Sequence, residues 1–170
     1  FISYAHKPYE DNLKNKLGKS VKGVFVDNEG DYGWKLAWSD DLEKVYKLKK
    51  KRDIRLWMPL MFEEDIEGKW AAARWNWYDV VSDIYSGGFL KPVSDWAESK
   101  GMYTISNLWE ENIMLQTLML GNPFQAHRSV TMPGNDCLFS GGLNVHDFKF
   151  VTLVLICREL AGSEKSTLFD

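Results

Sequence analysis

The chain is poor in cysteine and histidine, which limits the metal and disulfide chemistry that it can carry. Its 170 residues include two cysteines, Cys137 and Cys157, and three histidines. The two cysteines form neither a metal-binding spacing nor a disulfide framework, and a single bridge or two free thiols remain open. No HExxH pattern or paired histidine spacing occurs, so the sequence predicts no structural zinc site.

Long apolar runs and an excess of positive charge are also missing. The longest apolar run, 151–157, is too short to cross a bilayer. A net charge of -3 argues against nucleic acid as the main partner. The chain contains no GxSxG pattern, no P-loop and no GxGxxG after a strand. Serine-hydrolase and nucleotide-binding sites of the familiar kinds are therefore not predicted.

Tryptophan, by contrast, is abundant, with eight residues in the chain. Aromatic side chains support a large core, and they also stack on the C–H faces of pyranose rings. Trp34 and Trp109 lie near the ends of expected strands and are predicted to stack on sugar. Trp75 and Trp77 lie within a long expected helix and are predicted to pack in the core.

Segments of strand type and helix type alternate along the chain, which predicts an α/β fold. Apolar runs at 24–26, 102–109 and 130–132 are expected strands, and 150–157 is a candidate for a last one. Helical connections between strands predict a parallel sheet with right-handed crossovers. Three or four strands are fewer than the eight of a closed barrel. The predicted fold is therefore an open sheet or a partial (β/α)8 TIM-barrel-like sheet with flanking helices.

Three helices are expected around these strands. The first begins at Ser39, a suitable N-cap residue, with acidic residues in its first turn. The second covers about 69–100, is weakened at Gly87-Gly88, and kinks or restarts at Pro92. The third covers 112–120.

Acidic residues follow each of the expected strands. Asp27 and Glu29 follow the first strand, Glu110 and Glu111 the second, and Asp136 the third. The carboxyl ends of parallel strands meet at one edge of a sheet, where barrel enzymes build their active sites. Two carboxylates that face one cleft are what glycoside hydrolysis needs. The alternative is structural: an acidic turn after the first strand, and acidic residues that open the next helix after the second.

Several residues near these carboxylates are candidates to bind substrate. Asp27 is predicted to orient Glu29, to bind sugar hydroxyls or to hold a cation. Asp136 follows Pro133-Gly134, and a tight turn alone would explain that pattern. His146, beside Asp147, is the best candidate for a sugar contact among the histidines.

Four stretches of the chain are similar to one enzyme family. Over roughly 20–148 the sequence resembles glycoside hydrolase family 106. The resemblance is most specific in the strand that ends in Asp27 and Glu29, in Asp95-Trp96-Ala97-Glu98-x-x-Gly101, and in the segment 132–136. The four stretches are VKGVFVDNEGDYGWKLAWSDDL, RDIRLWMPLMF, RWNWYDVVSDIYSGGFLKPVSDWAESKGMYTISNLWEENIMLQ and VTMPGNDCL.

The resemblance implies an α-L-rhamnosidase-type enzyme with a (β/α)8 catalytic barrel inside a longer multidomain chain. It also implies an inverting reaction, in which one glutamate is the base and another the acid, and calcium near the sugar. By position Glu29 is expected to be the base and Glu110 the acid, with Glu111 as the alternative acid. No calcium ligands are assigned, and no other cofactor is expected.

The leading hypothesis is therefore a glycosidase fragment, residues 1–170 as a single domain, that hydrolyses a terminal deoxyhexoside of an oligosaccharide or polysaccharide. The second hypothesis is a non-catalytic carbohydrate-binding domain or truncated remnant of such an enzyme. A third is a different, retaining glycosidase on a similar barrel. The compartment stays open, a periplasmic or secreted full-length protein being one option.

Overall fold

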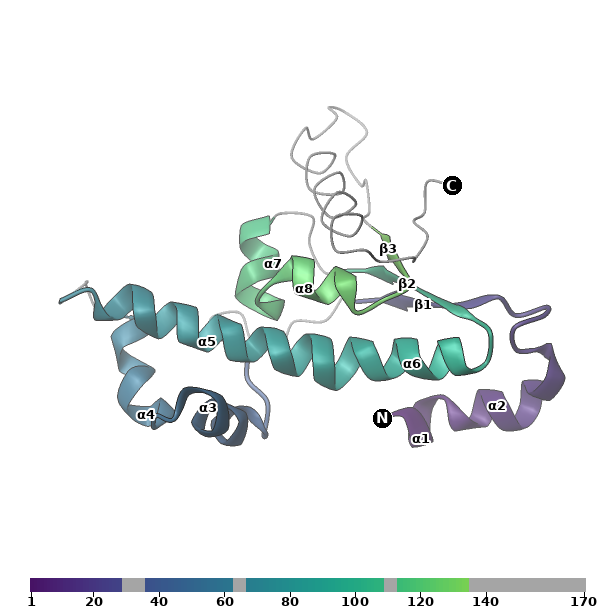
Figure 1. The fold of residues 1–170 in the computed structure, drawn as a ribbon, viewed down its shortest axis with the longest axis horizontal. Coiled ribbons are helices and arrows are strands. Elements are labelled where there is room, and N and C mark those ends of the chain that lie inside the picture. The colour runs from purple at the N-terminus through teal and green to yellow at the C-terminus, as the bar shows by residue number, and fades with distance from the viewer. Residues whose placement is uncertain (29–35, 63–66, 109–112, 135–170) are drawn as a thin grey trace, which may run out of the picture.

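A three-stranded parallel sheet lies at the centre of the computed structural model, which describes residues 1–28, 36–62, 67–108 and 113–134 (Figure 1). The strand order is β1-β2-β3. The strands are β1 (Gly23–Asp27), β2 (Tyr103–Asn107) and β3 (Met132–Gly134). The predicted α/β class and parallel sheet are confirmed, and the candidate strand at 150–157 lies outside the described residues.

The register of the sheet brings the ends of the strands together. Asp27 pairs with Asn107, and Asn107 pairs in turn with Gly134. β3 contains Pro133, which has no N–H to donate and is tolerated because β3 is an outer strand among those described. This strand begins two residues later than the 130–132 segment predicted from sequence.

One long helical rod forms the last part of the connection from β1 to β2. It consists of α5 (Lys69–Tyr85), the π-helical turn η3 (Ser86–Leu90) and α6 (Lys91–Ser99). The helix predicted over 69–100 is thus confirmed, and its predicted weak point at Gly87-Gly88 lies in the π-helical turn. Pro92 stands in the first turn of α6, where its missing N–H costs nothing.

The other helices are short. The α3 helix begins after Asp41, two residues later than the start predicted at Ser39. The Ser39 carbonyl accepts the N–H of Leu42, the first residue of the helix, at 3.0 Å. A helix that the sequence analysis missed follows Asn122, whose side chain accepts the N–H groups of the next turn as an N-cap. These helices are α1 (Ile2–Ala5), α2 (Lys7–Leu13), η1 (Lys14–Lys16), α3 (Leu42–Lys50), α4 (Ile54–Trp57), η2 (Pro59–Met61), α7 (Ile113–Leu120) and α8 (Pro123–Arg128).

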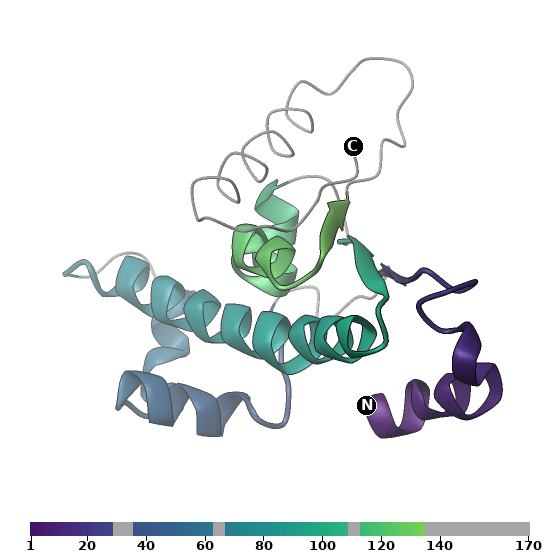
Figure 2. The same cartoon turned by 45° about the vertical axis from the view of Figure 1, so that its right-hand side comes forward.

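The two faces of the sheet differ in burial. Thr104 and Ser106 on β2 are fully buried on the face that the rod and α8 cover (Figures 1 and 2). Phe25 and Tyr103 point to the opposite face and are 59% and 37% exposed. Because successive side chains of a strand point to opposite faces, the described helices cover one face of the sheet and leave these two side chains of the other face exposed.

A second core lies between α5 and the helices α3, α4 and η2. Trp77 of α5 is its largest buried side chain, at 1% exposure. Leu42 and Tyr46 of α3 are buried in the same cluster, so this helix packs one apolar face against α5. Trp75, two residues from Trp77, is 74% exposed, so the prediction that it packs in the core is wrong.

Ion pairs connect α3 to α5. Lys49 Nζ lies 2.8 Å from Asp79 Oδ2 and 2.5 Å from Asp83 Oδ2, and Lys50 Nζ also donates to Asp79. Burial by itself would raise the pKa of Asp79, but hydrogen bonds from Lys49 and Lys50 outweigh it and hold that pKa below its ordinary value of 3.8. The lowered pKa means that the ionised carboxylate stabilises the folded state.

Replacing Asp79 with asparagine is expected to lower the free energy of unfolding by about 1 kcal/mol at pH 7, since the pair is partly exposed. A carboxyl group whose pKa is lowered by folding stabilises the folded state at pH values above its ordinary pKa. The difference in unfolding free energy between Asp79→Asn and the unmodified chain should therefore shrink as the pH falls below 3.8. Urea unfolding at several pH values measures both effects. Asp11→Asn, which removes a more exposed pair with Lys7, is the control and should cost less. A pH-independent loss for Asp79→Asn would contradict the prediction.

Within the described ranges, no helix combines the length and the apolar character that crossing a bilayer requires.

Candidate functional site

The edge where β1, β2 and β3 end, here called the carboxyl edge, is where the sequence predicts the chemistry. Asp27 and Asn107 are paired there, and adjacent strands of a sheet lie about 4.8 Å apart. Asn28 N–H donates to the Asn107 carbonyl at 3.1 Å, which extends the β1–β2 pairing by one residue. The backbone of both strands is therefore held in register up to their last residues.

Amide side chains form the buried part of this edge. Asn107 is 7% exposed, and its Nδ2 donates to Asp27 Oδ1 at 3.4 Å. Its Oδ1 is buried and has no hydrogen-bond partner in the part of the chain that the structure describes. Since a buried polar atom without a partner costs free energy, this oxygen marks a point of the edge that the described residues do not satisfy.

A helix residue anchors the other amide. Asn28 is 5% exposed, and its Nδ2 donates to the hydroxyl of Tyr85, which is 8% exposed near the end of α5. This contact joins residues 57 positions apart in the chain. It fixes the backbone position from which the chain continues to Glu29.

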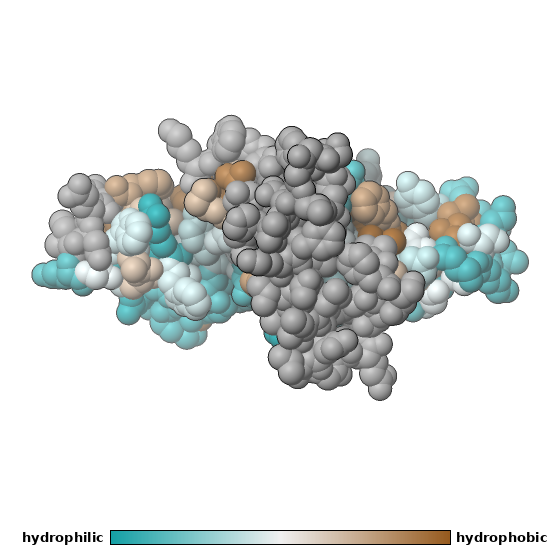
Figure 3. All heavy atoms as spheres, turned by 90° about the horizontal axis from the view of Figure 1, so that it is seen from above, coloured by the Kyte–Doolittle hydropathy of each residue, from teal (hydrophilic) through white to brown (hydrophobic). Residues whose placement is uncertain are grey.

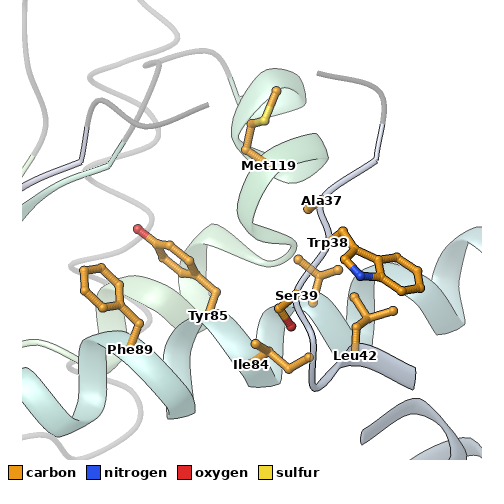
Figure 4. Close-up of a pocket in the computed structure, with 9 residues that line it drawn as sticks. Ala37, Trp38, Ser39, Leu42, Ile84, Tyr85, Phe89 and Met119 are labelled. Atoms are coloured by element: carbon orange, nitrogen blue, oxygen red, sulfur yellow. The ribbon is translucent and has the colours of Figure 1, made fainter. Parts of the chain in front are cut away.

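An apolar pocket of about 210 Å³ lies beside Tyr85, between α5, α7 and the segment that leads into α3 (Figure 4). Trp38, Tyr85 and Phe89 supply its aromatic walls. The Ser39 hydroxyl is one of its few polar groups, and Met119 of α7 closes it from above. Pockets with apolar walls and a few polar groups are the usual form of small-molecule sites.

Most of the predicted site residues lie outside the described residues. Asp27 lies within the described residues. It is exposed at the carboxyl edge and accepts a hydrogen bond from Asn107, a position compatible with the predicted contact to sugar hydroxyls. The others are not described, namely Glu29, Trp34, Trp109, Glu110, Glu111, Asp136 and His146.

The sequence analysis missed three residues of this edge. Asn28 and Asn107 carry a signal that could have revealed them, because each is a polar residue directly at the end of an apolar strand. Tyr85 carries no such signal, since its partner is distant in sequence. Its role depends on where the end of α5 lies relative to the end of β1.

The described residues do not form a calcium site. Calcium binds six to eight oxygen ligands. At the carboxyl edge the described side chains offer the Asp27 carboxylate and the buried oxygen of Asn107. Across the described ranges, no three His, Cys, Asp or Glu side chains are grouped to hold a metal ion.

Comparisons with models of protein families, with curated proteins and with solved structures found no match to this chain.

Proposed function

We propose that the chain is part of a glycoside hydrolase whose catalytic carboxylates follow β1 and β2. One observation carries the proposal: Asp27 and Asn107 end neighbouring parallel strands in register. Glu29 comes two residues after Asp27, and Glu110 comes three residues after Asn107. Carboxylates that leave adjacent strands at one edge are suited to act on the same glycosidic bond.

The proposed reaction needs one protonated and one ionised carboxyl group. Glu110, or Glu111 in its place, donates a proton to the glycosidic oxygen as the bond to the anomeric carbon breaks. Glu29 takes a proton from a water molecule, whose oxygen bonds to the anomeric carbon from the opposite face. This gives inversion at the anomeric carbon, as the resemblance to α-L-rhamnosidases of family 106 implies.

The sheet face that the described helices leave partly exposed supports a partial (β/α)8 barrel as the setting for this chemistry. In such a barrel the helices cover the outer face of the strands, and large side chains fill the inner face. The described helices lie on one face, and the other carries the exposed Phe25 and Tyr103 and the half-buried Ile105 and Met132. We infer that this apolar face belongs to the inside of a barrel, because large apolar groups are rarely left together in water.

The edge residues have positioning roles in this proposal. The contact between Asn28 and Tyr85 holds the start of the segment that carries Glu29. Asp27, which is exposed, is suited to accept hydrogen bonds from sugar hydroxyls. The apolar pocket beside Tyr85 would suit the methyl group of a deoxyhexose.

Hydrolysis of an aryl α-L-rhamnoside tests the proposal. We expect the unmodified chain to release the aryl alcohol, and Glu29→Gln and Glu110→Gln to abolish release, because each removes one of the two required carboxyl groups. Glu111→Gln decides between the two candidates for the acid. The anomer formed first, observed by NMR, reports inversion or retention.

Asp11→Asn serves as the matched control, since it also removes a carboxylate but lies in the exposed helix α2. Activity that survives both Glu29→Gln and Glu110→Gln would remove these residues from the mechanism. Sugar binding without turnover by the unmodified chain would instead favour the non-catalytic carbohydrate-binding alternative. The structure describes three strands, whereas a complete barrel has eight, and this difference favours that alternative.

A further inference from the structure

Trp75 is a large aromatic side chain that the fold leaves in water. It lies on α5 and is 74% exposed, whereas Trp77 on the same helix is 1% exposed. Tyr78 is three residues further along and therefore shares the face of the helix that Trp75 occupies. Indole groups presented on a rigid helix are a common element of binding surfaces, because they offer a large contact area with few rotatable bonds.

Trp75 borders a groove of about 550 Å³ between α5 and the turn from α7 into α8, here called the α5–α8 groove. This volume is within the range of small-molecule sites. Seen from above, hydrophobic and hydrophilic groups alternate on the surface over this half of α5 (Figure 3). The groove is lined by the rings of Trp70, Trp75, Tyr78 and Phe124 and by the polar side chains of Arg74, Asp79, Asn122 and Gln125.

Hydrogen bonds and close packing hold the walls of the groove in place. Asn122 N–H donates to Ser82 Oγ at 2.7 Å, and Gln125 Nε2 donates to Asp83 Oδ1 at 3.1 Å, so that α8 is fixed to α5. Arg74 stacks on the Trp70 ring at 4.2 Å and donates from Nε to the Met61 carbonyl at 3.1 Å. A surface held in this way loses little side-chain freedom when a ligand binds.

The charges in the groove are nearly balanced. Asp79 is paired with Lys49 and Lys50, and among the described residues that line the groove Arg74 is the one cation. Burial raises the pKa of the Tyr78 phenol, so its hydroxyl keeps its proton and can donate. Flat rings beside neutral and cationic donors suit an uncharged, polyhydroxylated ring, whose C–H face stacks on indole while its hydroxyls accept hydrogen bonds.

We propose that the α5–α8 groove binds a neutral oligosaccharide as a non-catalytic site, separate from the carboxyl edge. Trp75 and Tyr85 are ten residues apart on α5, which corresponds to about 15 Å along the helix. The groove therefore does not overlap the pocket beside Tyr85, and no lining residue is common to the two. The proposal goes beyond the proposed hydrolysis and does not depend on it.

Calorimetric titration of the Glu29→Gln chain with cellohexaose, xylohexaose and maltohexaose tests the proposal. This background removes turnover, so that binding is measured whether or not the chain is a hydrolase. We expect saturable binding of at least one of the three, weakened roughly tenfold or more by Trp75→Ala because the stacking surface is lost. Arg74→Ala should also weaken binding.

Tyr4→Ala is the control, since it removes another exposed aromatic ring, 90% exposed, outside the groove. It should leave the dissociation constant unchanged, and thermal unfolding should show that each variant remains folded. Failure of all three sugars to bind, or equal affinity of Trp75→Ala and the unmodified groove, would overturn the proposal. So would sedimentation showing a dimer that Trp75→Ala dissociates, because the ring would then be covered by a second copy of the chain.

Discussion

Replacing Trp77 with alanine is expected to lower the free energy of unfolding by roughly 3–5 kcal/mol. The side chain is 1% exposed and lies in the core between α3 and α5, so the change removes a large apolar contact and leaves a cavity. Its indole N–H has no hydrogen-bond partner within the described part of the chain. Trp77→Phe, which removes this N–H and keeps a ring, should therefore cost less than Trp77→Ala.

Trp75→Ala is the matched control for this prediction, because it makes the same substitution two residues away on the same helix at a side chain that is 74% exposed. Its effect on stability should be within about 0.5 kcal/mol of zero, as for most surface positions. Urea denaturation followed by circular dichroism gives both values. Equal losses for the two variants would show that Trp77 does not lie in a packed core.

Gly121→Ala is expected to lower the free energy of unfolding by roughly 2–5 kcal/mol, the sum of backbone strain and overpacking. Gly121 has φ +81°, in the left-handed region that disfavours a side chain. An added Cβ would lie 2.2 Å from Ser82 Oγ and 2.6 Å from the Tyr78 carbonyl oxygen. Because one of these neighbours is helix backbone, α7 and α8 would have to move away from α5.

Gly88→Ala provides the control for the same chemical change. Gly88 lies in the helical turn between α5 and α6, and nothing lies within 4 Å of an added Cβ. Alanine there should stabilise the chain by about 0.5–1 kcal/mol, because it restricts the unfolded state and favours helix. Thermal unfolding of both variants checks the pair. Similar melting temperatures for the two would contradict the close approach of Gly121 to α5.

Helical periodicity separates two predictions that the sequence analysis treated alike. Trp75 and Trp77 were both expected to pack in the core. Residues two apart on a helix point about 200° away from each other, so both cannot face one narrow core. The apolar stripe of α5 includes Trp77, Val80 and Val81, which are buried, and Trp75 lies on the other side.

Local signals predicted the positions of the main elements within a few residues. Apolar, β-branched runs identified the strands, and the Gly87-Gly88 pair identified the weak point of the long helix. The α8 helix was missed because it is only six residues long, and too few apolar positions recur in it to show a period. The start of α3 was placed two residues early, since Ser39 and Asp41 are both acceptable N-cap residues.

The sequence by itself determined the α/β class, the parallel sheet and the edge at which polar residues gather, because these follow from short-range patterns of apolar and polar residues. Only the tertiary structure decided that Tyr85 binds Asn28, which face of the sheet the described helices cover, and that Trp75 borders a groove. Each of these depends on how segments distant in sequence cross and pack, and side-chain packing of that kind leaves no local pattern in the chain.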